Sequence, residues 1–476
     1  MSPTDVRTKQ SIAALTITVV IALLWTVMPH PILIVAVCFA PLALLFVLNQ
    51  TFWLVTLFVI FSFFRIHEAF PAIYSFKIPL LLSLGALAAL AFHLLLSRQL
   101  TAFWHPSLKW LCIFWGLVII GIVFASSRDI TITVFKNTYW KIIVMTLAIT
   151  WLITKPQQLA QMSKAIIVAG MLIGLVALNN AANGIDLVEG TRVSIGRSIG
   201  SVLGDPNDLA LVLMFPLAFT VSQLMEKRSP TLLRLFALIT CFILFFAVIQ
   251  TQSRGGLLGS LSVFAYFAFK HIKSKTLVLV LGAVAALALY AFAGISGRES
   301  GGAAEDGIDA SAMGRLYAWE AAFKMALHHP FTGVGLDNFY FNYYFYSPHW
   351  DGINHAVHST WFGVLAETGF VGLAVFITLI VSLIRTSLKS ISLLTPDSDY
   401  ALTVGANAVL SGLIGTIVSG TFLTQALRGQ STSLPRSPWW LVVSFNLIVK
   451  MRNPNPFILT TMQLAVFKGL NPWHAL

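Results

Sequence analysis

The sequence predicts an all-α, polytopic integral membrane protein with about 12 to 14 transmembrane helices. Hydrophobic residues make up 57% of the 476 residues and charged residues only 10%, whereas a soluble domain carries roughly 25% charged residues. The mean hydropathy is +0.83. Apolar runs of about 20 residues recur along the chain, and a helix of that length crosses a hydrocarbon core about 30 Å thick.

The apolar runs give the elements in order, and each run predicts one crossing. Their approximate bounds are 11–28, 31–49, 51–64, 78–96, 109–125, 138–154, 164–181, 208–224, 232–250, 255–271, 275–294, 358–384, 400–424 and 438–449. The third and the last run are short, so twelve or thirteen crossings also fit the sequence. No small-residue cleavage site separates the first run from the second, which favours a retained helix over a signal peptide.

The charge pattern predicts which side of the membrane each loop occupies. The formal net charge of +12 does not indicate nucleic-acid binding, because the cations are scattered among short loops. With a cytoplasmic N-terminus, 11 of the 15 lysines fall on inner loops, as the positive-inside rule requires, and both termini are cytoplasmic. By contrast, 9 of the 15 arginines fall on the outer side. Guanidinium groups bind phosphate in a bidentate manner, although chance and pairing with outer carboxylates would also explain the excess.

The predicted loops divide the chain into four parts: N-terminal helices (1–181), helices with outer arginines (182–294), a long outer loop (295–357) and C-terminal helices that start at a histidine motif (358–476). The long loop begins with a Gly-, Ala- and acid-rich stretch that is typical of a flexible surface loop. Residues 315–329 then predict an amphipathic surface helix, whose apolar face comprises Leu316, Trp319, Ala322, Phe323 and Ala326. The aromatic stretch 340–350 fits either an interfacial belt or a sugar-stacking surface.

Six basic side chains on the outer side stand where helices begin or end: Arg192, Arg197, Arg254, Arg315, His355 and His358. Arg254 interrupts two apolar runs with only a tight turn between them, and a cation so close to hydrocarbon is expected to face a cavity or a ligand. The alternative is an arginine that anchors the turn by extending its head to the interface. We expect Pro206 and Asn207 to start the following helix.

The two histidines are candidates for acid–base catalysis, because a neutral imidazole accepts a proton near pH 7. A helix that starts near His358 would carry Trp361, Leu365, Gly369 and Gly372 on the same face, and the glycines would let a neighbouring helix approach. A zinc site would need three or four ligands, and the sequence offers neither a nearby carboxylate nor a paired cysteine to complete one. Cys38, Cys112 and Cys241 stand apart inside apolar runs. A surface histidine with no role is the remaining alternative.

These motifs resemble the bacterial O-antigen ligase and polymerase superfamily, which includes protein O-oligosaccharyltransferases. The ligases of that family carry a histidine, then Ser, Asn or Gln, then nine residues and a glycine, and here His358, Ser359 and Gly369 have that spacing. The stretches GDPNDLA, QSRGG and GRLYAWEAA…HPFTGVGLDNF resemble the other family landmarks in order. The resemblance covers roughly residues 190–380, and the rest matches only as a hydrophobic profile.

The resemblance implies a glycosyltransferase C-like membrane fold and a metal-independent transfer that needs no cofactor. The donor would be a glycan on undecaprenyl pyrophosphate, used on the periplasmic face of the bacterial inner membrane. His358 corresponds to the catalytic base of the family, Arg197 and Arg254 to arginines that hold the donor pyrophosphate, and Arg315 to an Arg-x-x-x-Trp segment. His355 and Arg192 are added as further substrate-binding candidates. The choice of His358 over His355 rests on the spacing to Gly369.

The acceptor expected from the closest resemblance is the lipid A–core oligosaccharide, with membrane lipids as surroundings and a monomeric chain. Two alternatives use the same chemistry: an O-antigen polymerase, and a protein O-glycosylation ligase. A third is an anion transporter, which should have broken helices that meet at mid-membrane with charges there. The charges of this sequence lie instead at the outer boundary, which favours an interfacial enzyme.

Overall fold

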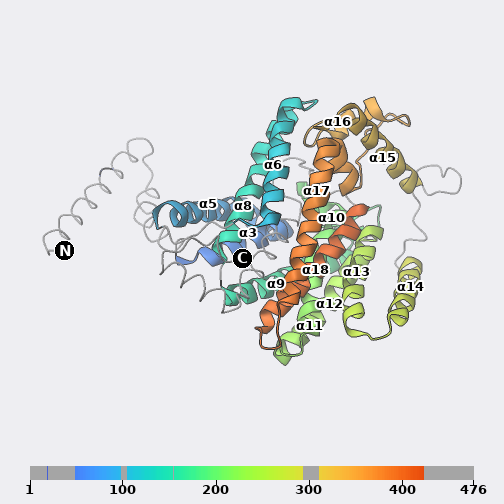
Figure 1. Cartoon of the computed structure of the whole chain (residues 1–476). Helices are drawn as coiled ribbons and strands as arrows, with labels where there is room; N and C mark the ends of the chain where they lie inside the picture. The colour runs from blue at the N-terminus through green and yellow to red at the C-terminus, as the bar shows by residue number, and fades with distance from the viewer. Residues whose placement is uncertain (1–18, 20–48, 98–103, 154, 293–309, 423–476) are drawn as a thin grey trace, which may run out of the picture.

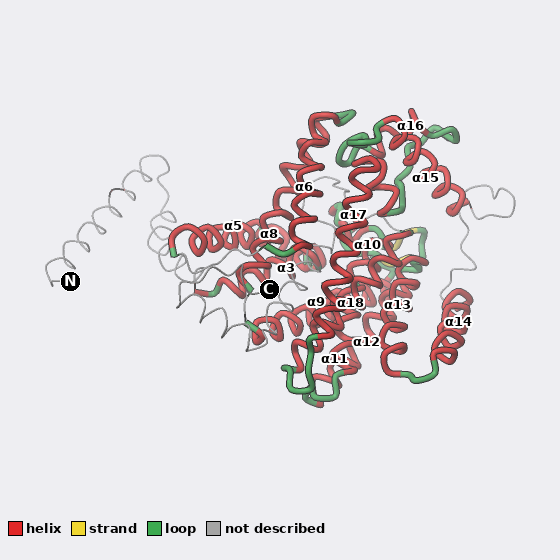
Figure 2. The backbone as a smooth tube through the Cα atoms, in the orientation of Figure 1, coloured by secondary structure: helices red, strands yellow, loops and turns green. Residues whose placement is uncertain are grey.

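The structure is a computed structural model that describes residue 19 and residues 49–97, 104–153, 155–292 and 310–422. Helices form most of the described chain (Figure 2), and the strands described are one short antiparallel pair in which Leu187 faces Val193. The first helices are α3 (Thr51–Phe63), α4 (Ile66–Ala69), η1 (Pro71–Phe76), α5 (Ile78–Ala91), η2 (Phe92–Leu96), α6 (Pro106–Phe124), α7 (Arg128–Val134), η3 (Phe135–Tyr139), α8 (Trp140–Leu152) and α9 (Pro156–Asn183). After the strands β1 (Leu187–Val188) and β2 (Arg192–Val193) come η4 (Arg197–Ile199), η5 (Val202–Gly204), α10 (Pro206–Val212), α11 (Met214–Met225), α12 (Thr231–Gln250), α13 (Arg254–His271), α14 (Lys275–Phe292), α15 (Ala310–His328), α16 (Phe339–Tyr346), α17 (Thr360–Ser392) and α18 (Tyr400–Thr421).

The all-α, polytopic membrane architecture is confirmed. Seven described helices are long and apolar enough to cross a membrane, and they correspond to the runs predicted at 78–96, 109–125, 164–181, 208–224, 232–250, 358–384 and 400–424. The runs at 51–64, 138–154, 255–271 and 275–294 also form helices, but these are shorter or less apolar. The runs at 31–49 and 438–449, and all of 11–28 except Val19, lie outside the described residues.

A large hydrophobic core joins α3, α5, α6, α8 to α13, α17 and α18. α11 and α18 are the central helices of this core, because most of their side chains are buried. α18 packs against α9, α11, α13 and α17. In Figure 1, α15 and α16 lie beside the upper part of α17, and the connection between α11 and α12 lies at the opposite end of the molecule.

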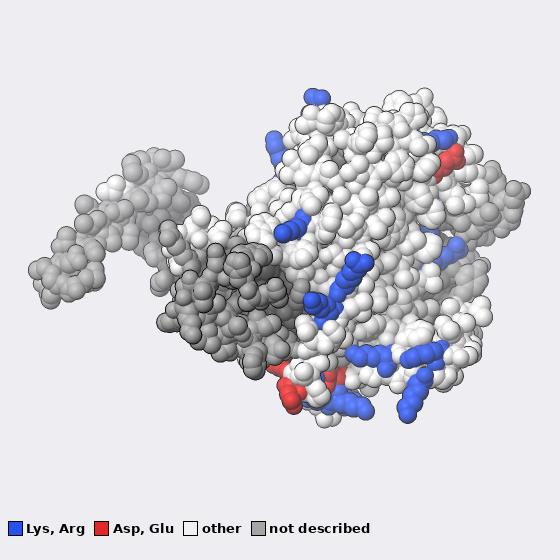
Figure 3. All heavy atoms as spheres, in the orientation of Figure 1, with Lys and Arg blue, Asp and Glu red and all other residues white. Residues whose placement is uncertain are grey.

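Loops that the charge pattern assigns to the inner side meet one another in space. Arg228, after α11, donates to the carbonyl oxygens of Pro396 (2.7 Å) and Ser398 (2.8 Å), before α18. Lys270, at the end of α13, donates to Asn407 Oδ1 at 2.6 Å. Lys and Arg side chains also gather at this end of the face shown in Figure 3. The loops assigned to the outer side meet as well, since Ser126 donates to Val334 O at 2.9 Å.

The helix predicted within the long loop is present as α15, but the face predicted for it is partly wrong. The buried side chains are Ala318, Ala321, Ala322, Met325 and Ala326, and they pack in a small core with residues of α16 and α17. Leu316 and Phe323 are exposed. Small side chains let α15 approach α17 closely, so the alanine face is buried instead of the bulky one. The Gly-rich stretch was predicted as a loop, but its residues 310–314 belong to α15.

Candidate active site

Arg192 is the centre of a buried polar cluster in the segment between α9 and α10, which the charge pattern assigns to the outer side. Arg192 belongs to strand β2 of the hairpin β1–β2, and the residue is only 4% exposed. Its Nε donates to Thr251 O at 3.2 Å and its Nη2 donates to Asn207 Oδ1 at 3.0 Å. Ser253 Oγ donates to the same Asn207 oxygen at 2.9 Å. These contacts tie the hairpin to the start of α10 and to the turn between α12 and α13, so the predicted substrate ligand Arg192 has protein acceptors here.

Arg254 follows this cluster directly, as the first residue of α13. The N-cap of that helix is Ser253, whose Oγ accepts from Gly256 N at 3.2 Å. Gly256 in turn packs against Ala210 of α10. The motifs QSRGG and GDPNDLA therefore form one unit, in which Asp205 caps α10 and accepts from Asn207 N at 2.7 Å. The prediction that Pro206 and Asn207 start a helix is confirmed.

Arg197 is exposed and lies in the loop that leads to this unit. It begins η4 after Gly196, and its backbone packs against Gly204. The hydrogen bond from Ile195 N to Leu203 O (2.8 Å) closes the loop around it. The guanidinium of Arg197 is thus presented at the surface from a loop whose two ends are fixed.

A buried charged group beneath this loop was missed by the sequence analysis. Arg65 and Glu68 are 3% and 4% exposed and form an ion pair. Glu68 also accepts a hydrogen bond from Ser201 Oγ, in the same loop as Arg197. The signal that pointed to it is the stretch FRIHEAF, where three titratable residues interrupt the apolar runs 51–64 and 78–96. The Arg65–Glu68 ion pair is thus connected to the Arg197 loop through Ser201.

A second group of candidate residues lies around α15 and the start of α17. Trp319 of α15 donates from Nε1 to Val357 O at 3.0 Å, and its indole stacks on Phe362 with centroids 5.0 Å apart. Arg315 is half-buried one helical turn before Trp319, hence on the same side of α15. The Arg-x-x-x-Trp segment therefore packs against the residue that precedes His358.

His355 is paired with a carboxylate that the sequence analysis did not consider. Its Nε2 lies 3.0 Å and 2.9 Å from Asp351 Oδ1 and Oδ2. The hydrogen bond from His355 holds the pKa of Asp351 below its usual value. The His355 ring also contacts Tyr343 edge-to-face at 5.4 Å. The statement that no carboxylate lies near this histidine is wrong, although one histidine and one aspartate do not complete a zinc site.

His358 stands just before α17 and not within it, which corrects the predicted helix start. α17 begins at Thr360, with Ser359 as its N-cap, and His358 has a left-handed backbone with φ 46°. Its neighbours Val357 and Ser359 are 4% and 1% exposed, so they fix its position. A non-glycine residue in this region costs on the order of 1–3 kcal/mol, and such residues cluster at functional sites.

Left-handed non-glycine residues are confined to one side of the described chain. All of them fall in segments that the charge pattern places outside or at the outer boundary: Arg65, Lys77, Asp186, Glu189, Gln252, Asp337 and His358. The side that the charge pattern assigns to the outside therefore contains these strained residues as well as most of the arginines.

Gly369, the last residue of the histidine motif, breaks α17. Its φ of 71° and ψ of −173° lie outside the helical region, so α17 consists of two helices that meet at a kink. A Cβ at Gly369 would lie 2.5 Å from Pro330 O, and one at Gly333 would lie 2.4 Å from Ala366 O. The atoms nearest to a Cβ at Gly372 would be those of Thr368, which belongs to α17 itself. The prediction that these glycines form one face with His358 for a neighbouring helix is therefore wrong.

The segment HPFTGVG fills the break in α17. Val334 N donates to Ala366 O at 2.8 Å, Gly335 N to Glu367 O at 3.2 Å, and Phe370 N to Pro330 O at 2.8 Å. The backbone groups freed by the break thus have partners in the protein. A transporter site would instead require such groups to face a substrate path.

The end of α18 links the two groups of candidate residues. A Cβ at Gly259 of α13 would lie 3.0 Å from Ser419 Cβ, and a Cβ at Gly420 would lie 3.1 Å from Thr360 Oγ1. Trp361 Nε1 also donates to Thr421 Oγ1 at 3.2 Å. The start of α13, with Arg254, and the start of α17, with His358, therefore flank the same end of α18.

Within the described residues, no group of three or more His, Cys, Asp or Glu side chains is placed to hold a metal ion. The chemistry available at this end of the molecule is that of guanidinium groups, which bind phosphate, and of imidazoles, which transfer protons.

Comparison with known proteins agrees with the motifs. Residues 239–377 match the family model described as O-antigen ligase. No curated protein matches the chain. Arg192, Arg197 and the GDPNDLA stretch precede the matched segment, so their assignment to the family rests on the motifs alone. Over residues 239–377, which carry Arg254, Arg315, His355 and His358, this chain matches the O-antigen ligase family, and the resemblance to the O-antigen ligase and polymerase superfamily is confirmed.

Proposed function

We propose that this protein transfers an O-antigen-type glycan from undecaprenyl pyrophosphate to a hydroxyl of the lipid A–core oligosaccharide. The reaction takes place on the periplasmic face of the bacterial inner membrane. The O-antigen ligase family supports transfer chemistry of this kind, and the multi-pass architecture supports a lipid-linked substrate. The donor, the acceptor and the side of the membrane are parts of the proposal.

One observation carries the proposal: a left-handed histidine and an arginine at a helix start flank the same end of α18. Arg254 is the first residue of α13, where the positive end of the helix dipole adds to its charge. Arg197 is presented from a loop held at both ends. This arrangement fits a diphosphate, whose oxygens accept bidentate hydrogen bonds from guanidinium groups.

In the proposed reaction, the acceptor hydroxyl oxygen attacks the anomeric carbon of the donor sugar. The bond between that carbon and the phosphate oxygen breaks, the electron pair leaves with undecaprenyl pyrophosphate, and the configuration at the anomeric carbon inverts. Arg197 and Arg254 bind the leaving diphosphate and stabilise the charge that develops on it. Arg192 holds Asn207 and the α12–α13 turn, and so positions Arg254.

His358 is the proposed general base that takes the proton of the acceptor hydroxyl. Its backbone is held between two buried residues, whereas His355, which is equally half-buried, is already bound to the carboxylate of Asp351. Next to His358, Ser359 Oγ is buried and makes no hydrogen bond to any of the described residues. Arg315, which lies one turn before Trp319 on the same side of α15, is the proposed substrate-binding residue of this helix.

The test compares two single variants of the full-length protein in liposomes with lipid-linked glycan and lipid A–core. His358→Ala is expected to lose about 10²–10⁴-fold in transfer rate, as removal of a general base does, while His355→Ala retains much of it. An inactive His355→Ala with an active His358→Ala would assign the base to the His355–Asp351 pair.

The acceptor is tested by separating the candidate acceptors in the same assay. Transfer to lipid A–core is expected. Elongation of a second lipid-linked glycan, or transfer to a serine or threonine of a pilin-like protein, would assign the chain to the polymerase or the protein ligase alternative.

A further inference from the structure

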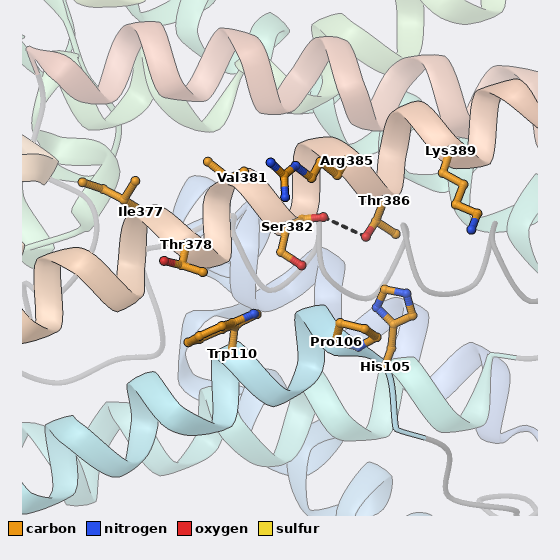
Figure 4. Close-up of a pocket in the computed structure, with 10 residues that line it drawn as sticks. All are labelled: His105, Pro106, Trp110, Ile377, Thr378, Val381, Ser382, Arg385, Thr386 and Lys389. Atoms are coloured by element: carbon orange, nitrogen blue, oxygen red, sulfur yellow. Dashed lines mark hydrogen bonds between the residues drawn. The ribbon is translucent and has the colours of Figure 1, made fainter.

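A pocket lies between the start of α6 and the second half of α17, far along α17 from His358. Its volume is about 430 Å³. Figure 4 shows Trp110 and His105 from the α6 side opposite Thr378, Ser382 and Thr386 of α17. The lining residues are His105, Pro106, Trp110, Ile377, Thr378, Val381, Ser382, Arg385, Thr386 and Lys389. This α6–α17 pocket belongs to the side where the lysine-rich loops meet.

Hydroxyl groups fix the two walls of the pocket against each other. Ser107 Oγ lies 2.9 Å from Ser382 Oγ and 3.1 Å from Thr386 Oγ1, and Ser107 is completely buried. Thr386 Oγ1 also donates to Ser382 O at 2.7 Å, within α17. The pocket therefore has a preformed floor, which lowers the cost of ordering a bound group.

The polar part of the pocket is positively charged. Arg385 and Lys389 line it together with His105, and none of its lining residues is a carboxylate. His105 Nδ1 accepts from Ser107 N at 3.2 Å, so the neutral ring carries its proton on Nε2, as a donor. The N-terminus of α6, which adds a partial positive charge, opens at the same place. This set of groups is complementary to a phosphodiester anion.

The apolar part continues along one stripe of α17. Ile377, Val381, Arg385 and Lys389 follow one another at intervals of four residues, which covers about 18 Å of helix. Ile377 and Val381 are 45% and 38% exposed, and the two cations come after them, toward the helix end. The polarity of this stripe changes in the same order as that of a phospholipid, from acyl chain to headgroup. Trp110 faces the stripe from the second turn of α6, and indoles are enriched near the ends of membrane helices.

We propose that the α6–α17 pocket binds the headgroup of an anionic phospholipid from the leaflet on the lysine-rich side. Its phosphodiester contacts Arg385, Lys389 and His105, and its acyl chain follows Val381 and Ile377. Basic pockets between transmembrane helices are suited to such lipids. The proposal does not depend on the transfer reaction. Because the pocket joins α6 to the lower half of α17, the bound lipid stabilises the packing of these two helices.

The test uses native mass spectrometry of the full-length protein in detergent, with phosphatidylglycerol and phosphatidylcholine of identical acyl chains added separately. The wild type should bind phosphatidylglycerol more tightly than phosphatidylcholine. In the R385Q/K389Q variant, two cations worth about 1 kcal/mol each are lost, so its affinity for phosphatidylglycerol should fall by about 30-fold. R385K/K389R keeps both charges and should stay within a few-fold of the wild type.

The matched control is K227Q/K273Q, which removes the same charge from exposed positions on the same side but outside the pocket. It should bind phosphatidylglycerol as the wild type does. The proposal is overturned if the control loses as much affinity as R385Q/K389Q, or if the wild type does not distinguish the two lipids. Displacement of phosphatidylglycerol by inorganic phosphate would also overturn it, because the pocket would then be a site for a free anion. The lipid comparison on the wild type remains decisive if R385Q/K389Q does not fold.

Discussion

Gly369→Ala tests the break in α17, on which the geometry around His358 depends. With φ 71° and ψ −173°, Gly369 occupies a region that is essentially restricted to glycine, so alanine there costs about 1–3 kcal/mol. The added Cβ would lie 2.5 Å from Pro330 O and 2.9 Å from His329 O, and the segment must move away. That movement removes the hydrogen bond from Phe370 N to Pro330 O, worth about 1 kcal/mol. The variant should therefore be destabilised by about 2–4 kcal/mol.

The assay is the denaturation midpoint of the purified protein in detergent, followed by transfer activity below that midpoint. Gly282→Ala is the matched control, because Gly282 lies in α14 and a Cβ there meets nothing within 4 Å. Alanine in a helix interior stabilises by about 0.5–1 kcal/mol relative to glycine, so the control should be neutral or slightly stabilised. If Gly369→Ala and Gly282→Ala have the same denaturation midpoint as the wild type, α17 is continuous at residue 369. The insertion of residues 330–335 into the break is then refuted.

Three further predictions concern the donor, the metal and the orientation. Arg254→Lys keeps the charge but loses the guanidinium fork, so the transfer rate should fall more than tenfold, for a contact worth roughly 1.5–3 kcal/mol. Arg128→Lys, at an exposed outer position, serves as its control, and unchanged turnover of Arg254→Lys would reduce Arg254 to an anchor of its turn. Transfer should persist in excess EDTA, and restoration of a lost activity by magnesium or manganese would reveal a metal site. In a background without Cys38, Cys112 and Cys241, a cysteine at Ala303 should react with an impermeant reagent in intact spheroplasts; labelling at Ser274 instead would reverse the orientation.

The helices could be predicted from the sequence, because each apolar run is bounded by polar residues or by helix-starting signals. Asp205 and Pro206 illustrate this, since the cap and the first residue of α10 stand together in the sequence. Which loops lie together was also predictable, because lysines mark one set of loops locally; that this set faces the cytoplasm stays a prediction. These features depend on residues within a few positions of one another.

The features that could not be predicted depend on contacts between distant segments. Glu68 and Ser201 are separated by 133 residues, and nothing in either segment indicates the other. Gly369 lies in an apolar run, where a glycine is read as a packing position of a continuous helix. Its role depends on Pro330, which belongs to a loop with its own turn signals. The pairing of His355 with Asp351 could not be predicted because both residues lie in a loop, where the spacing along the sequence does not fix which side chains meet.

The insertion of residues 330–335 into α17 has a consequence for how such proteins can diversify. A long outer loop between two membrane helices suggests a module that could be exchanged between relatives to change the acceptor. Here the loop supplies backbone hydrogen bonds to residues 366–370, in the interior of the next helix. In a chimera that exchanges residues 310–357 alone, the inserted segment and the break in α17 would come from different proteins, so their hydrogen bonds would not match. The smallest exchangeable unit extends from α15 to at least Phe370, so the start of α17, with His358, and the loop before it are inherited together.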